Sequence, residues 1–148
     1  MGISVYPVAG VIFDASGNLY GTTPYGLNDN GMIYKLIPDL DGTWSVNTLH
    51  RFINTQGGAN PFAGVVLDSA GNLYGAAQKG GAYGYGTVFK LTPASKSGWS
   101  ETVLHAFTNS SGGGSPYASL IFDSAGNLYG TTLGDGISMF GSVFEITP

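Results

Sequence analysis

The chain has 148 residues, a net charge of −4 and an apolar fraction of 43%, which is enough to bury a core and argues against intrinsic disorder. Only 9% of the residues are charged and the five basic ones are scattered, so a nucleic-acid surface, which needs clustered cations, is not expected. No apolar run approaches the ~18 residues of a membrane span, no export signal is recognisable, and without cysteine there is no disulfide or thiolate chemistry.

The order of short apolar runs and turns predicts an all-β protein. Twenty-five glycines, nine tyrosines and eight phenylalanines suit strands joined by tight turns. The first predicted strand covers residues 10–13, and the second begins at Asn18 with "NLYG". Two more are predicted over residues 32–36 and 44–52, and the last of these, "WSVNTLHRF", alternates apolar and polar side chains as a half-buried strand does. Sequential strands of this kind predict a four-stranded antiparallel meander.

One phrase then recurs about every 55 residues, which is typical of a repeat architecture. Its copies are "FDASGNLYGTT" (13–23), "LDSAGNLYGAA" (67–77) and "FDSAGNLYGTT" (122–132). In Asp-x-x-Gly-Asn the Asp side chain can accept backbone N–H bonds, Gly supplies positive φ and Asn tolerates the left-handed region. We expect Asp14, Asp68 and Asp123 to close the hairpin between the first two strands of each unit, with the following Leu and Tyr packed between units. Calcium binding by these acidic turns is the alternative.

The repeats predict a β-propeller of three four-stranded antiparallel blades in one domain. The units cover about residues 7–52, 61–107 and 116–148. The third unit ends after its third strand, and residues 3–6 are the one spare β-like segment that could complete it, within the chain or in another chain. Propellers use four to eight blades, and an incomplete ring exposes a strand edge and an apolar face. We therefore expect a homodimer closed head to tail into a six-bladed ring.

The two histidines occupy the same place in the fourth strand of their units. His50 lies in "LHRF" and His105 in "LHAF". A residue that the register repeats is expected to serve packing between blades, since an active site usually departs from the repeat.

Residues that break the repeat are therefore the better candidates for function. If the first strand of each blade is innermost, the loops after the second and fourth strands share one face, at the mouth of the channel. They contain Tyr25, Asn28, Asp29, Asn30, Asn54, Gln56, Asn60, Lys79, Tyr83, Tyr85, Asn109, Asp135 and Ser138. Asp29 and Asp135 have no acidic counterpart in the second unit.

A calcium site is one hypothesis for this face. Calcium takes six to eight oxygen ligands, and Asp29, Asn30, Asn60 and Asp135 are of the right chemical types. The cation would polarise an ester carbonyl and lower the pKa of a bound water. Asp29 or Asp135 would then be the catalytic residue that takes the proton of that water. That these are ordinary polar loop residues is an equally open reading.

A binding module is the rival hypothesis. Aromatic residues in glycine-rich loops could stack on a sugar or another small substrate, while amides recognise its polar groups. The residues concerned are Tyr25, Tyr83, Tyr85 and Phe140, with Asn54 and Asn109. The aromatic rings could instead wedge between blades, and a structural spacer without activity is a third possibility.

The combination of "FDSAGNLYGTT", "GTVFKLTP" and "GWSETVLHAF" resembles the Gloeo/Verruco ("GloVer") tandem repeat, from Pro7 to Pro148. The loops "PYGLNDNG" and "LGDGISMFG" depart from the commoner "KGGAYGYG". The resemblance implies propeller-type arrays of secreted or cell-surface bacterial proteins, most of them without an assigned activity.

A looser similarity links the same phrase to the NHL and gluconolactonase/paraoxonase propellers, in which a calcium ion in the channel polarises a lactone carbonyl. The chain is also similar to a small metagenomic GloVer-repeat hydrolase that opens acyl-homoserine lactones. These resemblances imply a calcium-dependent lactonase with a quorum-quenching role. The alternative is a carbohydrate-binding or structural propeller module without catalysis.

Overall fold

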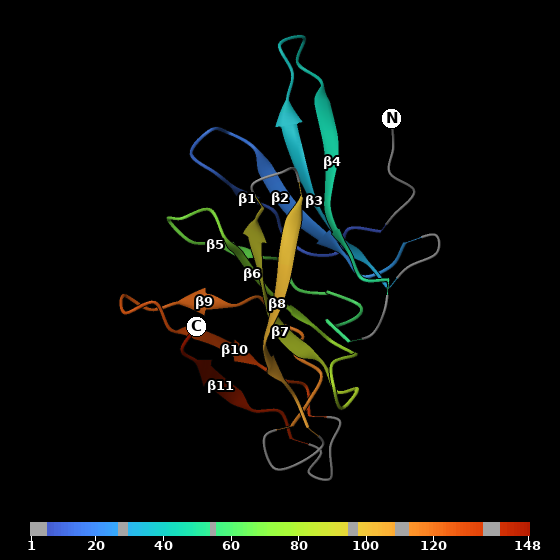
Figure 1. The fold of residues 1–148 in the computed structure, drawn as a ribbon, viewed down its shortest axis with the longest axis vertical. Coiled ribbons are helices and arrows are strands. Elements are labelled where there is room, and N and C mark those ends of the chain that lie inside the picture. The colour runs from blue at the N-terminus through green and yellow to red at the C-terminus, as the bar shows by residue number, and fades with distance from the viewer. Residues whose placement is uncertain (1–5, 27–29, 54–55, 95–97, 109–112, 135–139) are drawn as a thin grey trace.

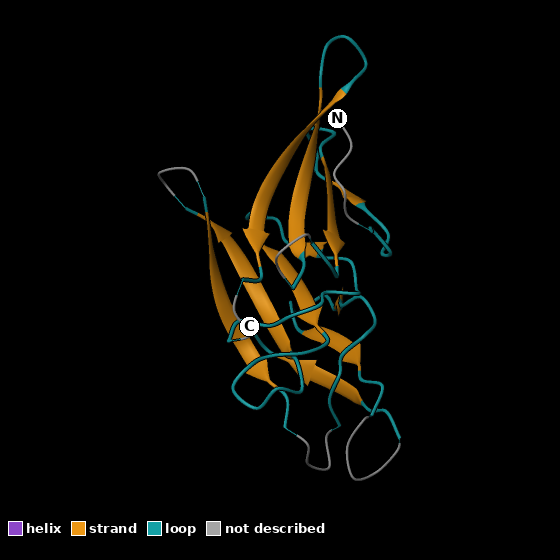
Figure 2. Ribbon diagram, turned by 90° about the vertical axis from the view of Figure 1, so that its right-hand side faces the viewer, coloured by secondary structure: helices purple, strands orange, loops and turns teal. Residues whose placement is uncertain are grey.

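The chain folds into three antiparallel sheets that follow one another in sequence order. The computed structural model describes residues 6–26, 30–53, 56–94, 98–108, 113–134 and 140–148. Within these ranges it contains strands and no helix. Figure 1 shows the sheets arranged along the longest axis, from the sheet of β1–β4 at the top to that of β9–β11 at the bottom, and Figure 2 shows them from the side. The predicted all-β class is confirmed.

Sheets 1 and 2 have four strands and sheet 3 has three among the described residues. Sheet 1 contains β1 (Ile12–Phe13), β2 (Leu19–Thr23), β3 (Met32–Pro38) and β4 (Trp44–Arg51). Sheet 2 contains β5 (Val66–Leu67), β6 (Leu73–Ala77), β7 (Thr87–Pro93) and β8 (Trp99–Ala106). Sheet 3 contains β9 (Ile121–Phe122), β10 (Leu128–Thr131) and β11 (Val143–Ile146). Each strand pairs with its neighbour in sequence, as a meander requires.

The first strand of each unit is shorter than predicted, and the residues just before these strands lie close to one another. The backbone N–H of Gly64 donates to Ser119 Oγ (3.1 Å). A Cβ on Gly64 would lie 3.0 Å from the carbonyl oxygen of Gly10. Three equivalent positions therefore meet, which places the first strands of the units side by side.

The repeated phrase forms the turn that its sequence predicts. Asp14 Oδ1 accepts the N–H groups of Ser16 and Asn18 (2.9 Å each), and Asp14 Oδ2 accepts Asn18 Nδ2 (2.7 Å) and Tyr20 Oη (3.1 Å). Burial raises the pKa of Asp14, but these hydrogen bonds outweigh it and lower the pKa to about 2. Asp68 and Asp123 accept the same set of bonds. Both oxygens of each carboxylate are thus engaged within the turn.

Two apolar clusters hold the sheets together. Tyr20 and Ile33 of sheet 1 pack on Leu73 and Phe89 of sheet 2 in the first cluster. The second joins Tyr74 and Val88 of sheet 2 to Leu120 and Leu128 of sheet 3, with Phe144 against it. The prediction that the Leu and Tyr of the phrase pack between units is therefore confirmed at these positions.

The glycine of each "NLYG" segment leaves room for an aromatic ring from the third strand of the same sheet. A Cβ on Gly75 would lie 2.5 Å from Phe89 Cζ, and one on Gly21 or Gly130 would collide in the same way with Tyr34 or Phe144. The invariant Gly of "NLYG" within this chain is thus explained by close packing against the third strand.

Candidate functional site

Several residues predicted at the mouth fall outside the part of the chain that the structure describes. They are Asn28, Asp29, Asn54, Asn109, Asp135 and Ser138. The calcium and catalytic roles proposed for Asp29 and Asp135, and the substrate-binding roles of Asn54 and Asn109, therefore stay predictions.

Asn30 and Asn60 are the other two predicted calcium ligands, and hydrogen bonds of Asn60 connect the loops of sheets 1 and 2. Asn60 donates its side-chain N–H to the carbonyl of Pro24 (2.9 Å) and its backbone N–H to the carbonyl of Asn30 (2.6 Å). The backbone of Asn60 is left-handed, with φ 57°, which asparagine tolerates well. Among the described residues no group of three or more His, Asp or Glu side chains could hold a metal ion.

Aromatic residues of three units form a row at the same loops. The ring of Tyr25 meets Phe62 edge to face at 5.6 Å, and Phe62 stacks on Tyr117 at 5.1 Å with 23° between the planes. Tyr25 and Tyr117 are exposed. Phe62 and Tyr117 were not predicted, although their shared place in "PFAG" and "PYAS" is visible in the sequence.

The remaining predicted aromatic residues divide into two groups. Tyr83 and Phe140 are exposed. Tyr85 packs against the second apolar cluster. Of the two readings that the sequence left open for these rings, Tyr85 therefore fits the wedge between units.

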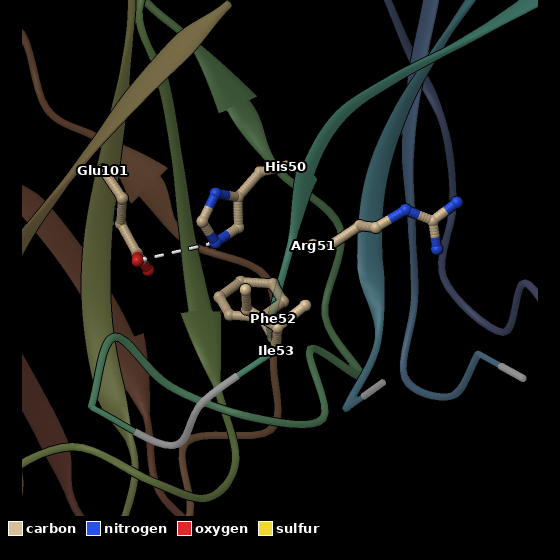
Figure 3. Close-up of a pocket in the computed structure, with 5 residues that line it drawn as sticks. All are labelled: His50, Arg51, Phe52, Ile53 and Glu101. Carbon is tan, nitrogen blue, oxygen red and sulfur yellow. Dashed lines mark ion pairs between the residues drawn. The ribbon is translucent and has the colours of Figure 1, made fainter. Parts of the chain in front are cut away.

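The structure adds a site that the sequence reasoning missed, a cavity of about 320 Å³ between sheets 1 and 2. It is lined by His50, Arg51, Phe52 and Ile53 of the first unit and by Glu101 of β8. His50 Nε2 lies 3.5 Å from Glu101 Oε2. Figure 3 shows the imidazole and the carboxyl facing each other, with the side chain of Arg51 directed away from them.

Burial sets the charge state of this pair. Each of the two side chains is only 18% exposed. Burial lowers the pKa of His50 and raises the pKa of Glu101, so both groups are biased towards their neutral forms. Glu101 Oε1 is buried and has no hydrogen-bond partner in the described part of the chain. A buried acceptor left open in this way is a frequent mark of a functional position.

The signal for this site is a departure from the repeat. Glu101 stands where the first unit has Val46, and Arg51 stands where the second has Ala106. The repeated histidine was expected to pack between blades, and the ring contact that the structure shows for His50 is with Phe52 of the same unit, edge to face at 4.7 Å. That expectation did not include a carboxyl partner for His50, which in the described part of the chain meets Glu101 of the following unit.

The fold and the site define an all-β repeat protein whose departures from the repeat meet at a cavity between units. The Gloeobacter/Verrucomicrobia repeat matches residues 4–148, and the chain belongs to this family. No curated protein matches the chain. No helix formed by the described residues is long and apolar enough to cross a membrane.

Proposed function

We propose that this protein is a hydrolase that opens a lactone ring, with His50 as the base that activates water. The observation that carries the proposal is the His50–Glu101 pair at 3.5 Å in a cavity between two repeats. A buried imidazole beside a carboxyl group is a candidate general base, because the carboxyl group orients the ring and burial favours the neutral form that accepts a proton. The similarity to lactone-opening propellers supports the choice of substrate class.

The chemistry follows from the two nitrogens of the ring. Nε2 faces Glu101, so a neutral imidazole that donates from Nε2 keeps a lone pair on Nδ1. Water adds to the lactone carbonyl carbon while Nδ1 takes its proton. The ring C–O bond then breaks, and the imidazolium returns the proton to the leaving oxygen. The product is the open-chain hydroxy acid.

The walls of the cavity suit a neutral ligand with an apolar portion. Phe52 is buried and Ile53 is exposed beside the pair. An acyl chain could lie against these two side chains while the ester faces His50. The acyl-homoserine lactones have this combination of a small polar ring and an apolar tail.

Calcium dependence is a separate part of the proposal. Asp29, Asn30, Asn60 and Asp135 would supply the oxygen ligands, and the ion would polarise the carbonyl. It is supported by the chemical types of these residues and by the similarity to calcium-dependent propellers.

We also propose that the three sheets are three blades of a ring that a second copy completes to six. The support is the order of the sheets and the meeting of their first strands. A ring of two identical halves is closed by a two-fold axis.

The hydrolysis is tested with an acyl-homoserine lactone and product detection by mass spectrometry. We expect His50→Asn to lower kcat/KM at least ~100-fold, the usual scale of a lost general base. His105→Asn, which alters the equivalent residue of the next unit, should retain the activity. The rate should persist below pH 6.5, the ordinary pKa of histidine, because burial lowers the pKa of His50. Full activity in His50→Asn would reject the mechanism.

Calcium dependence is tested in the same assay. Chelation, Asp29→Ala and Asp135→Ala should each abolish hydrolysis if the ion is required. Retained activity in all three, together with loss in His50→Asn, would leave the His50 mechanism and remove the metal.

Carbohydrate binding is the second candidate function, favoured by the row of Tyr25, Phe62 and Tyr117. Exposed rings held side by side offer flat apolar surfaces to sugar faces. A glycan array in which Tyr117→Ala loses a signal that the unaltered protein gives would support it. An array without signal would discard it.

A further inference from the structure

Each sheet has two faces that recur from unit to unit. We call the face turned to the following sheet the leading face and the face turned to the preceding sheet the trailing face. Ile33, Val88 and Val143 are equivalent positions of the leading face, and Val11 and Val65 are equivalent positions of the trailing face. The chain buries leading against trailing faces twice, between sheets 1 and 2 and between sheets 2 and 3.

The leading face of sheet 3 has no sheet against it in the described part of the chain. Ile33 and Val88 are both 0% exposed, whereas Val143 is 77% exposed. Ile121 is exposed beside it. A hollow of about 180 Å³ lies on this face, lined by Ser119, Ile121, Tyr129, Gly130, Thr131 and Val143. In the described part of the chain, Tyr129 and Val143 thus lack a covering sheet at the positions where Tyr20 with Ile33 and Tyr74 with Val88 are buried.

The trailing face of sheet 1 shows the converse. Val11 is 46% exposed, whereas its counterpart Val65 is 2% exposed. Phe13 is 66% exposed, and Trp44 is exposed where Trp99 of sheet 2 packs against the first cluster. The chain thus has an apolar surface at each end, and the two surfaces correspond to the two halves of an interface that the chain forms internally. Such a pair of surfaces is typical of a self-complementary assembly.

We infer that the leading face of sheet 3 binds the trailing face of sheet 1 of a second copy of this chain, and that two such seams close the assembly. The inference rests on the ring proposed above and names the residues that form it. Inside the chain, Tyr74 meets Phe122 edge to face at 5.2 Å and 86°. Their equivalents at the seam are Tyr129 and Phe13 of the partner subunit. Phe13 fills the hollow beside Tyr129, and Val143 becomes buried as Val88 is.

The test uses one charge on each face. Phe13→Asp alters the trailing face and Val143→Asp the leading face, so each variant has a damaged residue in both seams of a ring of its own copies. Leu40→Asp is the matched control, because Leu40 is fully exposed at the tip of the β3–β4 hairpin. The mass in solution is measured by light scattering after size exclusion, and folding by circular dichroism.

We expect the unaltered protein and Leu40→Asp to have twice the mass of one chain, and each face variant to have the mass of a single folded chain. An equimolar mixture of Phe13→Asp and Val143→Asp should form a dimer again, since one seam then joins two intact faces. This rescue separates head-to-tail contact from contact between like faces, in which only one variant would dissociate.

The outcomes distinguish the inference from the proposed ring. A single-chain mass for the unaltered protein at micromolar concentration overturns both the ring and the seam. A dimer that both face variants leave intact overturns the seam alone. Dissociation of only one variant, or no rescue on mixing, overturns the head-to-tail arrangement.

Discussion

The interface between sheets 1 and 2 and the interface between sheets 2 and 3 share their packing and differ in their chemistry. His50 meets Phe52 at 4.7 Å and 77°, and His105 meets Phe107 at 4.7 Å and 80°. The same histidine–phenylalanine contact therefore lies at the end of the fourth strand in both units. Packing alone does not separate the two histidines.

The two histidines differ in what the following unit places beside them. Glu101 of β8 reaches His50 across the first interface. In the described part of the chain no carboxylate lies within ion-pair distance of His105, because the described strands of sheet 3 end with β11. A repeat can thus keep the same histidine in two units and still form a distinct site at one of them, because in the described part of the chain only His50 lies against a fourth strand of the following unit.

The largest effect is expected in the cores of the two interfaces. Phe89 is fully buried in the first cluster, and Phe144 is its half-buried equivalent at the second. Phe89→Ala should lower the free energy of unfolding by about 3–5 kcal/mol, the usual cost of emptying an aromatic core position. Phe144→Ala should cost less, because part of its ring already contacts water. Equal losses in urea unfolding would mean that the second interface is as closed as the first in solution.

A smaller effect of opposite sign is expected at Glu101. Glu101→Val installs the residue of the equivalent position and removes a buried acceptor without a partner, so we expect the free energy of unfolding to rise by about 1 kcal/mol. Hydrolysis should be lost in the same variant. Val46→Glu, at an exposed position, is the matched control and should change stability little.

The pH dependence of the Glu101→Val gain has a defined sign. Burial raises the pKa of Glu101, so its protonated form is tolerated in the fold and its ionised form is costly. The gain should therefore be larger at pH 7 than at pH 4. A gain that is constant across this range would show that the carboxyl charge is not the cost.

The smallest effect on stability is expected at the Asp-x-x-Gly-Asn turns of sheets 1 and 3. Lys35 Nζ lies 3.8 Å from Asp14 Oδ2, whereas sheet 3 has Glu145 at the position of Lys35. Asp14→Asn should therefore destabilise the fold slightly more than Asp123→Asn, and salt should reduce the difference. Because the pKa of Asp14 falls from 3.8 to about 2 on folding, its contribution is present above pH 3.8 and is lost as pH falls towards 2. Thermal unfolding of both variants between pH 7 and pH 2 measures this.

The candidate site was only partly predictable. The loops that depart from the repeat pointed to Asn30, Asn60 and Tyr25, and the structure brings these to neighbouring loops. Phe62 and Tyr117 lie just beyond the loops that depart from the repeat, so the pattern did not point to them. His50 was assigned to packing because the repeat places a histidine at the same position of the fourth strand in both units, and its partner Glu101 lies in another unit.

The sequence by itself determined the strand order, the three-unit division and the Asp-x-x-Gly-Asn turns, because these depend on contacts within a few residues and on a pattern that the chain repeats. Only the tertiary structure decided that Glu101 faces His50 and that the faces of sheets 1 and 3 differ so much in exposure from their inner equivalents. Such facts depend on how one sheet lies on the next. No local pattern contains that relation, since His50 and His105 occupy the same strand position in their units and have different surroundings in space.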